Sequence, residues 1–139
     1  MGRNLAGNAG RPRILIVEDN PLNMELTAGL LECAGYEAIE AWDAENGIRL
    51  AREMRPELIL MDIALPGMDG IAAARILKED PCTNCIPIIA LSAHAMNGDE
   101  RNAYEAGCEA YITKPISSRN FAREISAFLG HRLSQAKAE

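Results

Sequence analysis

Five side chains suited to metal and phosphoryl chemistry stand where short apolar runs end. Glu18 and Asp19 follow RILIV, Asp62 follows LILM, Ser92 follows IIAL, and Lys114 follows AYIT. Carboxylates are ligands that Mg²⁺ prefers, and an aspartate carboxylate can attack phosphorus. A lysine and a hydroxyl can hold the oxygens of a phosphoryl group. The residue types therefore predict metal-assisted phosphoryl transfer, with Asp62 as the acceptor.

This chemistry requires the side chains to meet, although they lie far apart in the sequence. The carboxyl ends of parallel strands share one edge of an open α/β sheet, where ligands bind. Two unit charges about 4 Å apart repel by roughly 4 kcal/mol at an effective dielectric constant near 20. Three carboxylates gathered at that edge would therefore favour binding of a cation.

The elements that would position these residues can be recognised from the apolar pattern. Three of the five runs are apolar almost throughout, which is typical of strands covered on both faces in a parallel sheet. The predicted strands are Arg13–Val17, Ala38–Ala41, Leu58–Met61, Ile86–Leu91 and Ala110–Thr113.

A helical pattern follows each run. In the first helix, Leu22, Leu26 and Leu30 recur at a four-residue spacing and predict the core face. Trp42 is expected to pack, and a polar fourth helix is expected within Met96–Ala106. Helix starts are predicted from capping residues at Asn20, Asp43, Asp69 or Gly70, and Ser117.

Five strand–helix alternations imply right-handed crossovers and a three-layer α/β sandwich. We expect one domain over residues 12–130, with flexible tails at residues 1–11 and 131–139. The net charge of −6 gives no basic surface for direct binding of nucleic acid. No apolar run reaches the roughly 18 residues of a membrane span, and no secretory signal is evident. A cytoplasmic protein without membrane contact is the expectation.

Cys82 and Cys85 form a C-x-x-C pair. A zinc site needs a second ligand pair at suitable spacing, and the sequence has none. A redox pair usually opens a helix after a strand, whereas this one lies between a helix and a strand. An ordinary loop with reduced thiols is the favoured interpretation.

Four segments, ILIVEDNPLNMEL, LILMDIALPGMDG, PIIALSAHAM and AYITKPIS, resemble the receiver domain of two-component response regulators. The resemblance spans Arg13 to Leu129 and extends to stand-alone regulators and to receivers of hybrid histidine kinases. It implies a flavodoxin-like (βα)5 sandwich whose parallel sheet has the strand order 2-1-3-4-5.

The resemblance also implies a role for each site residue. The metal would be Mg²⁺, for which Mn²⁺ can substitute. The implied assignments are Asp62 as phosphoacceptor and metal ligand, Asp19 as direct ligand, Glu18 as ligand through water, the Ala64 carbonyl as a further ligand, Ser92 as switch hydroxyl, Lys114 as phosphate partner, Tyr111 as switch aromatic, and Pro115 after a cis peptide bond.

The expected function is a phosphorylation-activated switch rather than an enzyme. A sensor histidine kinase or a phosphotransfer protein would donate the phosphoryl group to Asp62. With no output domain after residue 130, a downstream protein would read the face formed by the helix in Met96–Ala106, the strand Ala110–Thr113 and the helix that opens at Ser117.

Three alternatives remain open. The first is a receiver module cut from a hybrid histidine kinase. The second is a Mg²⁺-dependent aspartyl-phosphate phosphatase, which usually has a second Asp two residues after the nucleophile, where this chain has Ala64. The third is a carrier of flavin mononucleotide, whose phosphate loop would be replaced here by Glu18, Asp19 and Asn20.

Overall fold

The computed structural model describes residues 11–65, 67–92, 99–113 and 120–129. Several predictions lie outside this part of the chain. These are the predictions on Lys114, on Pro115 and on the helix start at Ser117. The two predicted tails also lie outside it, except for Arg11.

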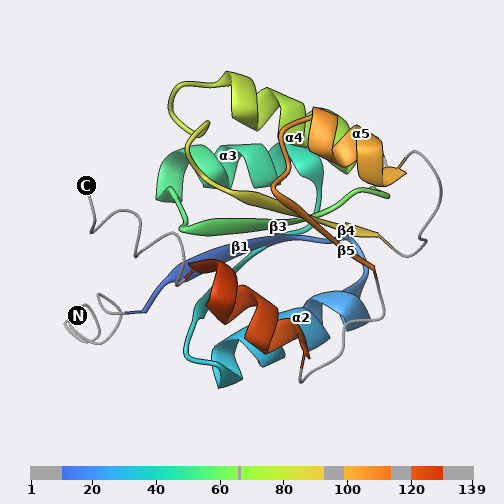
Figure 1. Cartoon of the computed structure of the whole chain (residues 1–139). Helices are drawn as coiled ribbons and strands as arrows, with labels where there is room; N and C mark the ends of the chain where they lie inside the picture. The colour runs from blue at the N-terminus through green and yellow to red at the C-terminus, as the bar shows by residue number, and fades with distance from the viewer. Residues whose placement is uncertain (1–10, 66, 93–98, 114–119, 130–139) are drawn as a thin grey trace.

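A five-stranded parallel sheet forms the middle layer (Figure 1). Its order, β2-β1-β3-β4-β5, is the one implied by the sequence resemblance. β3 and β4 are buried at every position, as their unbroken apolar runs predict. β4 begins later than predicted, after Pro87, whose carbonyl accepts a hydrogen bond from Ile59. The strands are β1 (Arg13–Val17), β2 (Glu37–Ala41), β3 (Leu58–Asp62), β4 (Ile88–Ser92) and β5 (Ala110–Thr113).

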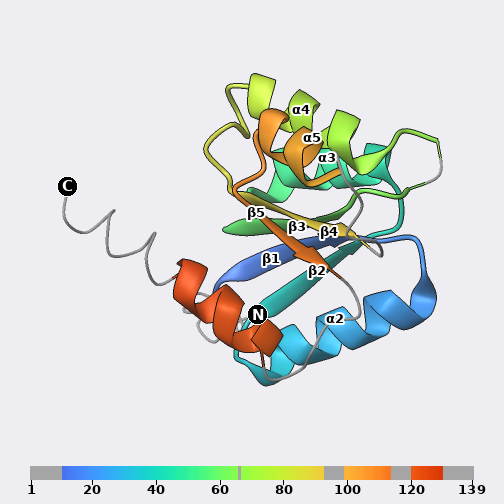
Figure 2. The same cartoon turned by 45° about the vertical axis from the view of Figure 1, so that its right-hand side comes forward.

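Helices cover both faces of the sheet (Figures 1 and 2). α3 (Ala44–Met54), α4 (Gly70–Glu79) and α5 (Asp99–Glu105) lie on one face. α2 (Pro21–Cys33) and a C-terminal helix over residues 120–129 lie on the other. The result is the predicted three-layer sandwich.

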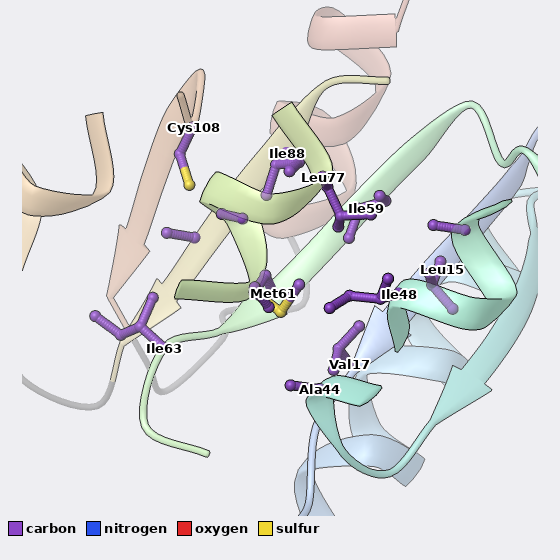
Figure 3. Packing of buried hydrophobic residues seen from close by; sticks show 14 of the residues in the cluster. Leu15, Val17, Ala44, Ile48, Ile59, Met61, Ile63, Leu77, Ile88 and Cys108 are labelled. Carbon is purple, nitrogen blue, oxygen red and sulfur yellow. The ribbon is translucent and has the colours of Figure 1, made fainter. Parts of the chain in front are cut away.

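Each face of the sheet has its own apolar core. Alternate residues of a strand point to opposite faces, so β1 contributes Leu15 and Val17 to one core and Ile14 and Ile16 to the other. Figure 3 shows the first core, where side chains of the sheet meet those of α3 and α4. The second core contains the predicted stripe of the C-terminal helix, since Phe121, Ile125 and Leu129 are buried there.

The predicted N-terminal caps within the described residues are confirmed. The Asn20 side chain accepts a hydrogen bond from the Asn23 amide at 3.0 Å. The Asp43 side chain accepts from the Asn46 amide at 2.8 Å, and the Asp69 side chain accepts from the Ala72 amide at 2.8 Å. These bonds satisfy amides that have no partner within the helix, and they set where α2, α3 and α4 begin.

Of the three leucines predicted to form the core face of α2, Leu30 is partly buried against the second core, and the prediction is wrong for the other two. Leu22 is 77% exposed and Leu26 is 44% exposed, whereas Met24, Ala28 and Leu31 are buried. α2 carries apolar residues on two sides, so spacing alone does not decide which side meets the sheet. Trp42, expected to pack, is also 44% exposed. The helix and the adjoining end of β2 therefore present apolar side chains to solvent.

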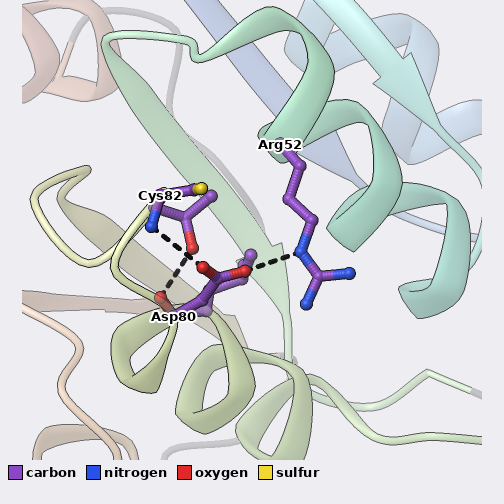
Figure 4. A network of polar contacts seen from close by, with 5 residues as sticks. Arg52, Asp80 and Cys82 are labelled. Carbon is purple, nitrogen blue, oxygen red and sulfur yellow. Dashed lines mark hydrogen bonds and ion pairs between the residues drawn. The ribbon is translucent and has the colours of Figure 1, made fainter.

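Cys82 and Cys85 lie in the turns between α4 and β4, as the loop interpretation predicts, and all four cysteines are free. The Cys82 amide donates to Asp80 at 2.9 Å, and Arg52 of α3 contacts the other carboxylate oxygen at 2.7 Å (Figure 4). The Cys82 amide, and then Arg52, hold the pKa of the Asp80 carboxyl below its usual value. This network ties the α4–β4 connection to α3.

Cys108 differs from the other three cysteines because it is buried. Desolvation raises the pKa of its thiol from 9.0 to about 11, and the Lys78 ammonium opposes this only in part. At pH 8 its thiolate fraction is then about 100-fold lower than for an ordinary thiol. We expect Ellman's reagent to modify three thiols rapidly in the native protein and the fourth only after unfolding. Four equally fast thiols would contradict this burial, and Cys108→Ala should leave the fast phase unchanged.

Candidate functional site

Three carboxylates converge at the carboxyl edge of the sheet. Glu18 and Asp19 follow β1, and Asp62 is the last residue of β3. β1 and β3 are neighbours, with Val17 opposite Met61. One carboxylate oxygen from each of the three acids lies within 4.8 Å of the others. The structure therefore brings together the acidic cluster that the sequence predicted.

Local backbone contacts fix two of these acids. The Glu18 amide donates to the Ala41 carbonyl at 3.0 Å, so the chain stays against β2 beyond the end of β1. The Glu18 carboxylate accepts from the Asn20 amide at 3.2 Å. Asp62 accepts from the Ala64 amide at 3.0 Å. Glu18 is 1% exposed and Asp62 is 4% exposed, so their orientation is set before any ligand arrives.

Gly70, the first residue of α4, lies directly against the backbone of Asp62. A Cβ atom at this position would lie 2.2 Å from the Asp62 carbonyl oxygen and 2.7 Å from the Ile63 Cα. Both contacts are with backbone atoms, which cannot rotate away. A glycine is therefore required for the start of α4 to approach the end of β3 this closely. The sequence analysis treated Gly70 only as a possible helix start and missed this role.

The remaining predicted residues take the following positions. Ser92 is the last residue of β4, next to β3, and is 3% exposed. Tyr111 is half-buried on β5 and packs against the core beneath α3, α4 and α5. Ala64 is exposed, and its amide faces Asp62. Thr113, opposite Ser92, ends β5, and Lys114 comes next in the sequence, outside the described residues.

The chemistry of the donor set fits a divalent cation. Two of the three acids are almost fully buried, where bringing negative charges together is costly. The third, Asp19, is exposed and leaves the cluster open to solvent. A hard cation that retains some of its water suits such a partly open set of carboxylates. The same arrangement would repel the phosphate of a flavin, which disfavours the carrier alternative.

Comparison with known proteins identifies the family. The response regulator receiver domain model matches residues 14–126. The polar-differentiation response regulator DivK of Brucella anthropi is 49% identical over 117 residues, which cover 84% of this chain and 95% of that protein. DivK of Brucella ovis is 48% identical over the same shares of the two chains.

In the part of the chain that the structure describes, every helix is too short or too polar to span a lipid bilayer.

Solved structures agree with this result. The receiver domain of the sensor histidine kinase PA1611 from Pseudomonas aeruginosa, which has a magnesium ion coordinated in its active-site cleft, is 35% identical with a TM-score of 0.81. That match covers 87% of this chain and 99% of the other. A CheY-like receiver from Methanospirillum hungatei is 28% identical with a TM-score of 0.84, covering 91% and 99%. This chain belongs to the response regulator receiver domain family, and it is a DivK-like receiver of two-component signalling.

Proposed function

We propose that this protein is a phosphorylation-activated switch in which Asp62 accepts a phosphoryl group from a sensor histidine kinase or a phosphotransfer protein. The convergence of Glu18, Asp19 and Asp62 within 4.8 Å at the edge of the sheet carries the proposal. Family membership and the similarity to DivK support it. In this proposal the protein acts in the cytoplasm.

The proposed metal is Mg²⁺, held by Asp19 and Asp62 directly, by Glu18 through water, and by the Ala64 carbonyl. The magnesium ion in the cleft of the related PA1611 receiver supports this choice, and Mn²⁺ would substitute. When bound, the cation neutralises negative charge on the carboxylates and on the incoming phosphoryl oxygens.

Asp62 acts as the nucleophile in the proposed reaction. Its oxygen forms a bond to phosphorus while the bond between phosphorus and the donor histidine nitrogen breaks, and that nitrogen keeps the electron pair and later takes a proton. The Ala64 amide, 3.0 Å from one Asp62 oxygen, helps to hold the carboxylate in place for this attack. Lys114 would pair with the phosphoryl oxygens, and a cis bond before Pro115 would orient that loop.

Ser92 and Tyr111 would convert phosphorylation into a change of surface. The Ser92 hydroxyl would move toward the phosphoryl group, and Tyr111 would then turn inward. About 5.5 kcal/mol of differential stabilisation is needed to reverse a 1:99 equilibrium. Charge-assisted hydrogen bonds to a phosphoryl group are of the strength required. A downstream protein would read the face formed by α5, β5 and the C-terminal helix, without direct contact with nucleic acid or membrane.

The decisive experiment is labelling with acetyl phosphate. We expect the wild-type chain to gain one base-labile phosphoryl group in the presence of Mg²⁺, as measured by intact mass, and to gain none with EDTA. Asp62→Asn should abolish labelling completely, because the amide oxygen is a poor nucleophile. Asp80→Asn is the matched control, since Asp80 lies at the other end of α4 and should not affect labelling.

Labelling that persists in Asp62→Asn would overturn the assignment. Steady turnover of nitrophenyl phosphate would instead favour the phosphatase alternative, although Ala64 replaces the acid which that mechanism uses. Transfer onward from Asp62 to a phosphotransfer protein, with no effect on a downstream regulator, would favour the hybrid-kinase alternative.

A further inference from the structure

A groove runs between α2 and the end of the edge strand β2, apart from the acidic cluster. It has a volume of about 350 Å³. Glu25, Gly29 and Glu32 line it from α2, and Glu40 and Trp42 line it from β2 and the residue after it. Figure 2 shows the two elements side by side. These five residues define the α2–β2 groove.

The apolar part of this surface is unusual for a solvent-facing region. Of the four large hydrophobic side chains that are exposed in the described residues, Trp42 lines the groove, and Leu22 and Leu26 lie on α2 outside the groove lining. Single exposed hydrophobic residues are common, whereas a group of them indicates a contact surface. Tryptophan is also among the residues that contribute most to binding energy at protein interfaces.

All the charged residues that line the groove are glutamates. Glu25, Glu32 and Glu40 are exposed, and within the described residues none of them takes part in an ion pair. Glu32 lies in the last turn of α2, where the negative end of the helix dipole makes an acidic residue unfavourable. The sequence thus keeps a carboxylate at a position where it destabilises the helix.

Gly29 is a second unfavourable choice at the same place. It lies in the middle of α2, where glycine costs about 0.5–1 kcal/mol relative to alanine. A Cβ atom there would have no heavy atom within 4 Å, so packing inside this chain does not require glycine. Local rules that are broken without an internal reason are expected at functional sites. The missing side chain leaves open space on the α2 side of the groove.

We propose that the α2–β2 groove binds a segment of a partner protein that presents an arginine beside apolar side chains. The guanidinium would lie among Glu25, Glu32 and Glu40 and against the face of the Trp42 ring. Arginine suits this site because it stacks on aromatic rings and pairs with carboxylates in a planar geometry. The apolar neighbours would contact Leu22 and Leu26 and enter the space above Gly29.

The sequence has a single tryptophan, so fluorescence of Trp42 reports directly on this groove. The probe is the peptide N-acetyl-Leu-Arg-Leu-Arg amide, compared with the same peptide carrying glutamine in place of arginine. We expect a saturable change in Trp42 emission with the arginine peptide up to millimolar concentration, weakened by added salt. The glutamine peptide should give no change.

Variants locate the binding. Gly29→Leu adds a side chain at the groove, where the new Cβ has no heavy atom within 4 Å, and it should weaken binding at least tenfold while keeping the fold, as checked by circular dichroism. The pair Glu25→Gln and Glu32→Gln should do the same through loss of charge. Asp19→Asn is the control for peptide bound at the acidic cluster, and it should leave the affinity unchanged.

Four results would overturn the proposal. The first is the absence of any saturable response, and the second is a response that survives both Gly29→Leu and the glutamate pair. The third is a response that disappears in Asp19→Asn, because the peptide would then occupy the acidic cluster. A Trp42 signal that depends on protein concentration, with a dimer in sedimentation velocity, would identify a second copy of this chain as the occupant instead of a basic partner.

Discussion

Asp19→Asn is expected to stabilise the metal-free protein while it removes most of its affinity for Mg²⁺. Asp19 lies in a cluster with two buried carboxylates, and one oxygen from each of the three acids lies within 4.8 Å of the others. Repulsion at such a distance reaches roughly 4 kcal/mol at an effective dielectric constant near 20 and about 1 kcal/mol in water. Because Asp19 is exposed and its charge is screened, we expect a gain of about 1 kcal/mol in the free energy of unfolding.

The order of stability should reverse when Mg²⁺ is added. A ligand at 100 times its dissociation constant stabilises the native state by about 2.7 kcal/mol. Loss of a direct carboxylate ligand should weaken binding by about 10-fold or more, so the variant keeps at most about half of that stabilisation. Urea unfolding in EDTA and in Mg²⁺ measures both effects on the same two proteins.

Asp80→Asn is the control for loss of a negative charge elsewhere. It weakens the contact with Arg52, so the unfolding free energy should not rise, and the response to Mg²⁺ should match that of the wild type. If Asp19→Asn lowered the stability in EDTA, mutual repulsion would not dominate the cluster. If its response to Mg²⁺ were normal, Asp19 would not be a ligand.

Among the glycines that the structure describes, Gly70 is expected to show the largest loss of stability when it is replaced by alanine. The new Cβ would lie 2.2 Å from the Asp62 carbonyl oxygen, 2.7 Å from the Ile63 Cα and 2.8 Å from the Asp62 carbonyl carbon. Relief requires α4 to move away from the end of β3. Forced overpacking of this kind costs about 1–3 kcal/mol and sometimes more. Because the contacts at Gly70 are with backbone atoms, we expect Gly70→Ala to lower the free energy of unfolding by about 3 kcal/mol or more.

Gly29→Ala is the matched control, because both variants add one methyl group to a helical glycine. At Gly29 no heavy atom lies within 4 Å of the added Cβ, and we expect a gain of about 0.5–1 kcal/mol. Urea unfolding compares the two. Equal effects at the two positions would mean that α4 does not need this close approach. A Gly70→Ala protein that folds should also bind Mg²⁺ more weakly, since Asp62 moves with its backbone.

The sequence alone determined the layers and the residues of the acidic cluster, whereas the strand order was implied by the resemblance to receiver domains. Unbroken apolar runs such as those of β3 and β4 indicate burial on both faces, and parallel strands place their carboxyl ends at one edge. The caps at Asn20, Asp43 and Asp69 were also readable, because each depends on a side chain and an amide only three residues away. These features follow from local chemistry or from the regular geometry of a parallel sheet.

Only the tertiary structure decided which side of α2 faces the sheet, why Gly70 must be a glycine and where Trp42 lies. α2 has apolar residues on two sides, and packing against β1 and β2 selected Met24 and Leu31 over Leu22. The contact between Gly70 and the Asp62 backbone joins α4 to β3. No periodicity in the sequence predicts the distance between these two elements. Such packing choices depend on how closely two surfaces approach each other in space. The spacing of residues along the chain does not determine that distance.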